Sequence, residues 1–373
     1  MSSWIRWAGR AACVVAFAGA AVPALAQIKI GQTAGFSGPV AAGVKEVSEG
    51  AKLYLDAVNK AGGVAGQHIE VIALDDKFDP ALAAENAKKL IDQGVVALFL
   101  TRGTPHTQAV MPLLLQYRVP LIGPSTGAMA LHTPVHPWLF NVRATYQREA
   151  ERAVRHLSLI GMERIALVQV DDSFGSDAAI GALAGFTGVN KHPVVHEKFD
   201  RTKPDMAPII PKLMKADAQA VLFIGSGNMV ADGVKLLRSA GSRAQVVTLS
   251  NNASAGFVKS LGDNARGTVV SQVFPYERSL SAPIVKEAIE YGKAAGIGEV
   301  TPAMLEGYAA AKVLVEGLRR AAPNITRERL RSALEGFKRV DLGGLELSYS
   351  PTDHSGLDYA DLSIVGEDGR FMR

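Results

Sequence analysis

Residues 28–31 read IKIG, and the stretch from this motif to residue 74 decides the fold class. The alternation in IKIG is typical of a strand. Apolar residues then recur at i, i+4, i+7 and i+11, the spacing of one helix face: Val47, Ala51, Tyr54 and Val58. Gly62-Gly63 ends this helix, and residues 69–74, IEVIAL, form the next strand. Strand, helix and strand in this order predict a parallel β-α-β unit.

The same alternation continues along the chain. Asp79 caps a helix with Pro80 at its first position, and Gly241 ends a later helix as a left-handed cap. Further strands are predicted at 95–100, 120–123, 165–170, 193–199, 220–225 and 246–249, and further helices at 105–117, 177–186 and 229–240. This repetition predicts an α/β protein whose parallel sheets are covered by helices on both faces.

The pattern changes after residue 300. Two helices follow each other, at 302–321 after Thr301 and at 327–336 after Thr326. This change suggests that the chain returns here to the lobe formed by its N-terminal part, the first of two expected lobes. A polar turn at 350–353 then leads into a strand at 362–365. The chain is longer than one hydrophobic core usually serves, so two lobes are expected.

Residues 1–26 have the pattern of a secretory signal peptide. Arg6 and Arg10 precede an apolar run at 11–21, and Ala24-Leu25-Ala26 forms an A-x-A cleavage site. Cleavage after Ala26 predicts an exported protein that begins at Gln27. A retained membrane anchor is the disfavoured alternative, because the apolar run is too short to span a bilayer. Cys13, the one cysteine, falls in the discarded peptide, and a large exported protein without disulfides fits the bacterial periplasm.

Charge and composition argue against a nucleic-acid partner. The formal charge of +4 falls to +2 when Arg6 and Arg10 are removed, and Lys and Arg are spread along the chain. Hydrophobic residues make up 48% and charged residues 20%, a globular profile without a second long apolar segment. No basic stripe with stacking aromatics is visible, so no nucleic-acid partner is expected.

Hydroxyl side chains follow two of the predicted parallel strands. One loop reads Thr101-Arg102-Gly103-Thr104-Pro105 and the other Pro124-Ser125-Thr126-Gly127. Ligands of open parallel sheets bind beyond the carboxyl ends of the strands. Hydroxyls and free backbone N–H groups at a helix start would bind a carboxylate there. The alternative is that Thr104, Ser125 and Thr126 only cap helices.

Three further kinds of site are disfavoured. Gly123-Pro124-Ser125-Thr126-Gly127 fits the G-x-S-x-G elbow of a serine hydrolase, but Pro134 follows too soon for a long supporting helix, and Asp353-His354 alone make no triad. The pairs His132/His136 and His192/His196 have prolines that disrupt the helical spacing of a metal site. Gly225-Ser226-Gly227 matches the start of the G-x-G-x-x-G dinucleotide motif, but position 230, where the third glycine belongs, is Val. No metal or cofactor is therefore expected, and no enzyme.

Several short motifs, in order, resemble the periplasmic solute-binding proteins of ABC transporters in the branched-chain amino acid (Leu/Ile/Val-binding) group. They are Ile28-Lys29-Ile30-Gly31 with Ser37-Gly38-Pro39, Asn59 to Val64, Gly103-Thr104-Pro105, Pro124 to Gly127, Asp172 to Gly175, and Gly369-Arg370-Phe371. The resemblance implies the type I periplasmic-binding fold, with two Rossmann-like lobes joined by three hinge crossovers near 143–146, 271–276 and 345–350. Lobe 1 would comprise 27–144 and 275–345, and lobe 2 would comprise 145–274 and 346–373.

The resemblance also implies a set of ligand-binding residues. Gly103, Thr104, Ser125 and Thr126 match the loops that grip a ligand carboxylate, with Ser37 bordering the cleft. Tyr146, Asp172 and Phe174 match positions that face the ligand from lobe 2.

Two loops of this chain depart from the pattern of the group. Where the amino-acid binders of this group place a glutamate that meets the ligand's ammonium, this chain has Ser250-Asn251-Asn252. Where they place an aromatic residue in the loop after the strand at 220–225, this chain has Ser226-Gly227-Asn228. Asn228 and Asn252 therefore complete the candidate set. Asp172 would either supply the missing charge or cap the helix that follows. Arg143 would pair with an acidic ligand or, as we favour, with a carboxylate at the hinge.

Together these features predict a periplasmic receptor that captures a small carboxylate-bearing solute, an amino acid or another organic or aromatic acid, by hinge closure. Its expected partner is the membrane permease of an ABC importer, and the chain is expected to act as a monomer. The alternative is a ligand-sensing module for a membrane signalling receptor.

Overall fold

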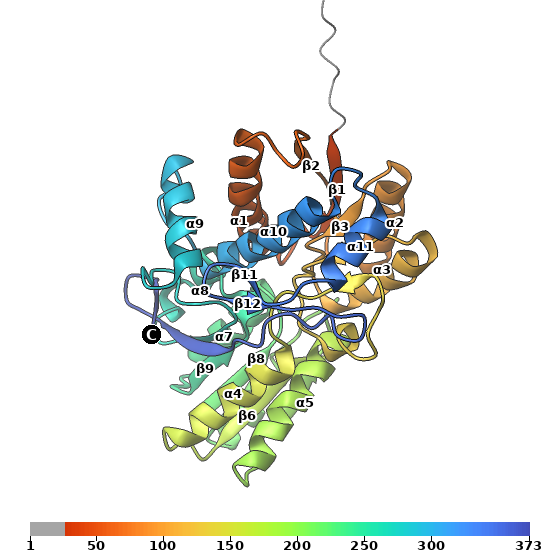
Figure 1. The fold of residues 1–373 in the computed structure, drawn as a ribbon. Coiled ribbons are helices and arrows are strands. Elements are labelled where there is room, and N and C mark those ends of the chain that lie inside the picture. The colour runs from red at the N-terminus through yellow and green to blue at the C-terminus, as the bar shows by residue number, and fades with distance from the viewer. Residues whose placement is uncertain (1–26) are drawn as a thin grey trace, which may run out of the picture.

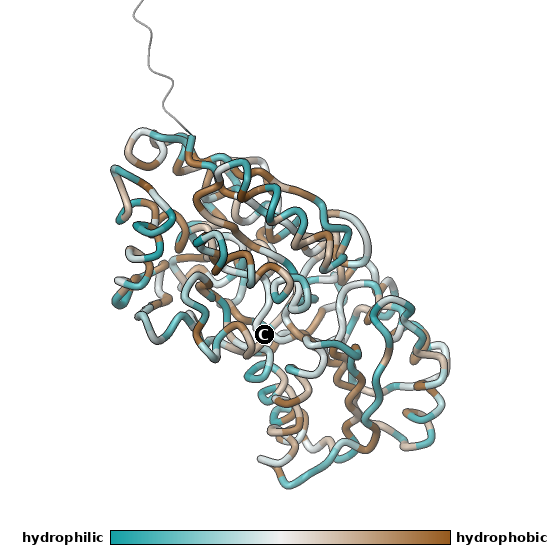
Figure 2. The backbone as a smooth tube through the Cα atoms, turned by 90° about the vertical axis from the view of Figure 1, so that its right-hand side faces the viewer, coloured by the Kyte–Doolittle hydropathy of each residue, from teal (hydrophilic) through white to brown (hydrophobic). Residues whose placement is uncertain are grey.

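The computed structural model describes residues 27–373, so the predicted signal peptide at 1–26 lies outside the described residues. The chain forms a five-stranded sheet in the order β2-β1-β3-β4-β5 and a seven-stranded sheet in the order β14-β13-β10-β9-β8-β6-β7. We call the body built on the five-stranded sheet the first lobe and the other the second lobe. They lie at opposite ends of the molecule in Figures 1 and 2.

The first lobe contains most of the N-terminal part of the chain. Its elements are β1 (Ile28–Ala34), α1 (Ala41–Lys60), β2 (Ile69–Asp75), α2 (Pro80–Asp92), β3 (Ala97–Phe99), α3 (Thr104–Tyr117), β4 (Leu121–Ile122), η1 (Met129–Leu131) and β5 (Leu139–Phe140). All its strand pairs are parallel. Neighbouring residues of β3 face opposite sides: Leu98 packs in one core cluster and Phe99 in another. The sheet is therefore covered on both faces, as predicted.

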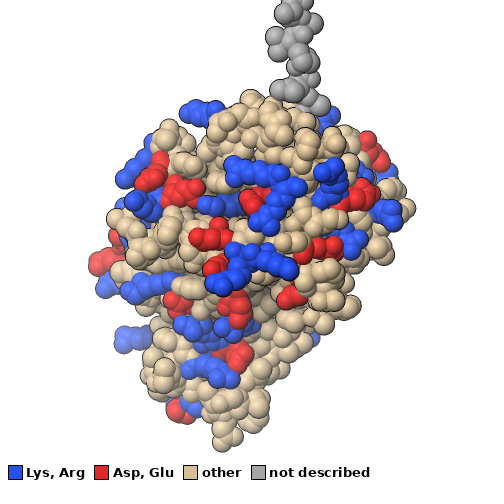
Figure 3. Space-filling model, viewed as in Figure 1, with Lys and Arg blue, Asp and Glu red and all other residues tan. Residues whose placement is uncertain are grey.

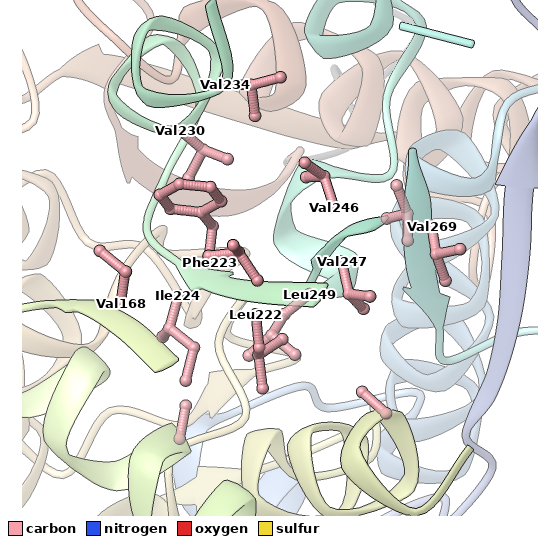
Figure 4. Packing of buried hydrophobic residues seen from close by; sticks show 14 of the residues in the cluster. Val168, Leu222, Phe223, Ile224, Val230, Val234, Val246, Val247, Leu249 and Val269 are labelled. Carbon is pink, nitrogen blue, oxygen red and sulfur yellow. The ribbon is translucent and has the colours of Figure 1, made fainter. Parts of the chain in front are cut away.

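The second lobe repeats the arrangement. Its elements are α4 (Tyr146–Leu159), β6 (Ile165–Val170), α5 (Ser173–Gly188), β7 (His196–Phe199), α6 (Ile210–Lys215), β8 (Ala220–Ile224), α7 (Asn228–Ser239), β9 (Gln245–Thr248), η2 (Ser250–Asn252), α8 (Ala255–Leu261), η3 (Gly262–Asn264) and β10 (Val269–Gln272). Figure 4 shows Phe223 pointing toward Val230 and Val234 of α7, while Leu222 and Ile224 point to the other face.

The last hundred residues belong to both lobes. Helices α9 (Pro283–Ala294), α10 (Pro302–Ala321) and α11 (Arg327–Glu335) and the hairpin β11 (Val340–Asp341) and β12 (Glu346–Leu347) pack on the first lobe, whereas β13 (Asp361–Val365) and β14 (Phe371–Met372) join the second sheet. The chain thus passes between the sheets after β5, after β10 and after β12. The helix predicted at 302–321, α10, returns to the first lobe as expected and packs against α1.

Some details differ from the sequence predictions. Helix α4 was not predicted, although Ala150, Ala153, Val154 and Leu157 have helical spacing and are buried. Strand β13 pairs antiparallel with β10, so the second sheet is not wholly parallel. Residues 346–360 were placed with the second lobe, yet Leu347, Tyr349 and Leu357 pack in a core of the first.

The surface carries charges of both signs. In Figure 3, Lys and Arg are interspersed with Asp and Glu over the face shown. Within residues 27–373, no helix has the length and apolar character needed to cross a membrane.

Candidate ligand site between the lobes

A pocket lies where the strand-end loops of the two lobes meet. Its lining combines α1 and the loops after β1 and β3 with the loops after β8 and β9 and the start of α8: Pro39, Val40, Ala42, Gly43, Arg102, Gly227, Asn228, Asn251, Asn252, Ser254, Gly256 and Phe257. The space measures about 20 Å³, room for about one water molecule. The lobes are therefore closed on each other, and Arg102 is the sole charged side chain in this lining.

The hydroxyl residues predicted in the first lobe are brought together. Gly103, with φ of +93°, precedes α3, and Thr104 Oγ1 lies 2.7 Å from Thr126 Oγ1. Ser125 Oγ accepts a hydrogen bond of 2.8 Å from Arg102 Nη1. Thr104, Ser125 and Thr126 are all at least 98% buried. The loops after β3 and β4 thus meet in one buried polar cluster, as expected for neighbouring parallel strands. None of the four predicted residues, Gly103, Thr104, Ser125 and Thr126, belongs to the pocket lining.

Ser37 lies apart from this cluster. Its backbone N–H and its hydroxyl both donate to the carboxylate of Asp75, at 3.2 and 2.6 Å, and its side chain is exposed. Its neighbour Pro39, rather than Ser37, lines the pocket.

Tyr146 and Phe174 pack on each other at the hinge. Their ring centroids are 4.6 Å apart, and both are nearly completely buried. The Arg143 guanidinium lies 4.5 Å from the Tyr146 ring centroid. Neither ring belongs to the pocket lining in this closed arrangement.

Asp172 is engaged within the protein. Its Oδ1 accepts the N–H of Gly175 at 2.9 Å and caps α5, and its Oδ2 pairs with Arg201. The Arg201 guanidinium also lies 4.8 Å from the Phe78 ring centroid, across the lobe boundary. The capping alternative is thus confirmed, and the carboxylate already has a cation.

The three asparagines that line the pocket from the second lobe differ in their contacts. Asn252 donates to Gly225 O and Thr248 Oγ1 at 3.0 and 2.8 Å, and accepts from Gly227 N at 2.8 Å, so it joins two loops. The backbone carbonyl of Asn251 accepts from Arg102 Nη2 at 2.6 Å. Asn228 has an exposed side chain at the edge of the pocket.

Arg143 pairs at the hinge, as favoured from the sequence. It is 1% exposed and contacts Glu149, Ser250 and, at 3.8 Å, Glu306. Burial alone would lower the pKa of Arg143, but the charge of Glu149 raises it above the usual value. This cation is therefore neutralised by the protein itself.

The lobes also contact each other directly beside the pocket. Glu46 of α1 accepts the N–H groups of Ala255 and Gly256 at the start of α8, at 3.0 and 2.9 Å. Pro39 O accepts from Asn228 N at 3.4 Å. These contacts hold the closed arrangement.

The residues considered for a hydrolase or a metal site make contacts within the fold. Ser125 meets a guanidinium rather than an imidazole, and His354 stacks on Phe140 with Nδ1 2.9 Å from Leu139 O. Burial lowers the pKa of His132 to about 4. Within the described part of the chain, no group of three or more His, Cys, Asp or Glu residues is placed to hold a metal ion.

Arg102 is the residue that sequence reasoning missed. The sequence places it in the loop after β3, but its pattern assigned no role to this side chain. One signal could have marked Arg102 as a candidate site residue: it lies directly after a strand, beside the helix start at Gly103-Thr104.

Two α/β lobes, three chain crossings and strand-end loops that face each other define a type I periplasmic-binding fold, a solute-binding architecture. The chain belongs to the periplasmic binding protein family, whose model matches residues 27–368. Its relatives and its fold are those of solute-binding proteins, not of enzymes.

Three similar proteins illustrate the relationship. A Leu/Ile/Val-binding protein homolog of Brucella melitensis is 27% identical over 91% of this chain and 92% of its own. A substrate-binding periplasmic protein of Ralstonia solanacearum is 30% identical with a TM-score of 0.85, over 93% and 99% of the chains. A possible leucine/isoleucine/valine-binding protein of Rhodopirellula baltica is 27% identical with a TM-score of 0.88, over 95% and 98%.

Proposed function

We propose that this protein is the periplasmic receptor of an ABC importer, exported by a signal peptide that is removed after Ala26, and that it captures a small carboxylate-bearing solute as a monomer. The observation that carries the proposal is the pocket at the lobe boundary, which residues of both lobes line. Names of similar proteins, such as the Leu/Ile/Val-binding protein homolog of Brucella melitensis, support a solute of amino-acid size.

Capture would occur by closure of the two lobes. The loops holding Gly103, Thr104, Ser125 and Thr126 would present hydroxyls and N–H groups to the carboxylate from the first lobe. A ligand favours the closed state only through contacts that it makes better there, and residues of the second lobe complete those contacts on closing. The closed surface would then be recognised by the permease.

A binding screen tests the proposal. Residues 27–373 are purified and their thermal unfolding is followed with branched-chain and other amino acids and with aliphatic and aromatic acids. A ligand at 100 times its dissociation constant stabilises the fold by about 2.7 kcal/mol. We expect such a shift with at least one small carboxylate, and none with the corresponding amide. The absence of any shift across the screen would contradict the proposal.

Transport is tested separately. A strain that lacks the gene should lose uptake of the radiolabelled ligand found in the screen, and the wild-type gene should restore it. Unchanged uptake in the deletion strain would argue against the importer role while leaving ligand capture intact.

A further inference from the structure

Arg102 is a buried cation at the centre of the lobe boundary. Its side chain is 95% buried, yet it comes from a loop whose other polar residues are uncharged. Its guanidinium donates to Ser125 Oγ of the first lobe at 2.8 Å and to the carbonyl of Asn251 of the second lobe at 2.6 Å. It therefore spans the cleft between the two lobes.

This guanidinium has no anionic partner among the residues that the structure describes. Within residues 27–373, no carboxylate oxygen lies within 4.0 Å of its nitrogens, although Arg143 and Arg201 nearby pair with Glu149 and Asp172. A buried charge is costly unless it is paired with an opposite charge. Arg102 thus differs from its two neighbours, whose charges are compensated inside the fold.

The pocket lining carries no negative charge that would compensate an ammonium; its asparagine side chains are neutral. None of its lining residues is acidic. The carboxylate oxygens of Asp172 are engaged by Gly175 and Arg201, and those of Glu46 accept Ala255, Gly256 and Thr301. The lining from the second lobe consists of neutral asparagines, a serine and apolar groups.

We propose that Arg102 binds the ligand carboxylate and that the ligand class is small carboxylic acids without an ammonium group. This inference rests on the proposed function and makes it specific. When the ligand enters, the guanidinium exchanges the carbonyl of Asn251 for a carboxylate, because a carboxylate brings the opposite charge and two acceptor oxygens, whereas the carbonyl is a neutral single acceptor. Ser125, already bonded to Arg102, orients the guanidinium toward the ligand.

The test uses matched pairs of compounds. Leucine is compared with ketoisocaproate and phenylalanine with phenylpyruvate, which differ in the ammonium group, and phenylacetate is compared with phenylacetamide, which differ in the charge of the carboxyl group. Binding is measured by calorimetry for the protein spanning residues 27–373. We expect the oxo acids to bind at least tenfold more tightly than the amino acids, and the acid at least tenfold more tightly than its amide.

Variants then assign the preference to Arg102. Arg102→Gln should weaken binding of the acid roughly 10- to 100-fold and abolish the preference for acid over amide. Arg102→Lys keeps the charge and should keep the preference, and it serves the test if the Gln variant fails to fold. Arg164→Gln removes an exposed arginine that pairs with Asp217 in the second lobe and should change nothing.

The outcomes separate the inference from the proposed function. If amino acids bind more tightly than their oxo acids, or if Arg102→Gln keeps the acid preference, the inference is wrong while a receptor function stands. If neither these pairs nor any compound of the wider screen binds, the proposed function itself fails.

Discussion

At the scale of single residues, Arg143 and Glu149 form the polar centre of the hinge. Arg143 follows β5 and Glu149 lies in the first turn of α4, where its Oε2 accepts the N–H of Ser250 at 2.9 Å. Glu149 also accepts a hydrogen bond from Ser271 of β10. One buried carboxylate therefore connects the first chain crossing with η2 and with strand β10 of the second lobe.

Replacing Glu149 should be strongly destabilising. We expect Glu149→Gln to lower the free energy of unfolding by about 3–5 kcal/mol, because the buried Arg143 guanidinium loses its closest counter-ion. Urea denaturation measures the change. Arg148→Gln is the control, since its ion pair with Asp358 is exposed and should contribute less than about 1 kcal/mol. Equal effects of the two substitutions would contradict the role of Glu149.

Asp76, directly after β2, is a buried carboxyl whose ionisation opposes folding. It accepts from Thr33 Oγ1 and from Phe78 N, at 3.2 and 2.9 Å, and is completely buried. Burial raises the pKa of Asp76 from 3.8 to about 6. Between these values the folded state binds more protons than the unfolded state, so this group reduces stability as pH rises from about 4 to 6.

Asp76→Asn should remove this pH dependence. The amide oxygen can accept from Phe78 N and the amide nitrogen can donate to Thr33 Oγ1, but the group carries no charge, so the variant should gain stability relative to wild type as pH rises. We expect no advantage near pH 4 and about 1–3 kcal/mol at pH 7. Urea denaturation at both pH values measures the difference. A variant less stable than wild type at pH 7 would show that the ionised carboxylate is needed.

At the scale of elements, glycines allow the main helix pairs to approach closely. A Cβ on Gly307 of α10 would lie 1.8 Å from Val47 O of α1, and one on Gly50 of α1 would lie 1.9 Å from Met304 O of α10. In the second lobe, a Cβ on Gly181 of α5 would lie 2.1 Å from Gln147 O of α4. Each lobe therefore has a helix pair in which backbone meets backbone.

A single added methyl group should disturb the α1–α10 pair. We expect Gly307→Ala to lower the free energy of unfolding by about 1–3 kcal/mol, because overpacking displaces a helix. Gly292→Ala in α9 is the control: its Cβ would come no closer than 3.4 Å to Val300 Cγ2, and the higher helix propensity of alanine should stabilise by up to about 1 kcal/mol. Thermal unfolding compares both. A stabilising effect at Gly307 would contradict this packing.

At the scale of the whole molecule, glycines also allow the two lobes to meet. A Cβ on Gly256 of α8 would lie 2.3 Å from Ala42 Cβ of α1, and one on Gly227 would lie 2.0 Å from Pro39 O. These contacts cross the lobe boundary next to the pocket. Bulk at these positions therefore opposes closure without entering either core.

Gly256→Val should shift the molecule toward an open form. We expect a larger radius of gyration by small-angle X-ray scattering. Ligand binding should weaken about tenfold if the closed population falls to one tenth. Gly298→Val is the control, because no atom lies within 4 Å of the added Cβ. Unchanged scattering together with unchanged affinity for Gly256→Val would contradict closure through this contact.

The sequence by itself determined the order of elements and the class of fold. Helix α10 begins and ends as predicted, because Thr301 caps it and Pro302 occupies its first position. These are local signals, and periodicity carries them within one element. Thr104, Ser125 and Thr126 were also predictable neighbours, since the carboxyl ends of adjacent parallel strands must meet at one edge of a sheet.

Only the tertiary structure decided the charge balance of the site. Asp172 pairs with Arg201, and Asn252 bonds to Gly225 and Thr248. Arg102 has no carboxylate partner within residues 27–373. The Asp172–Arg201 and Asn252–Gly225 contacts join separate loops, and no local pattern specifies which carboxylate meets which guanidinium. The pairing of buried charges is a property of the packed chain. An unpaired charge becomes costly only when the two lobes together exclude water from it.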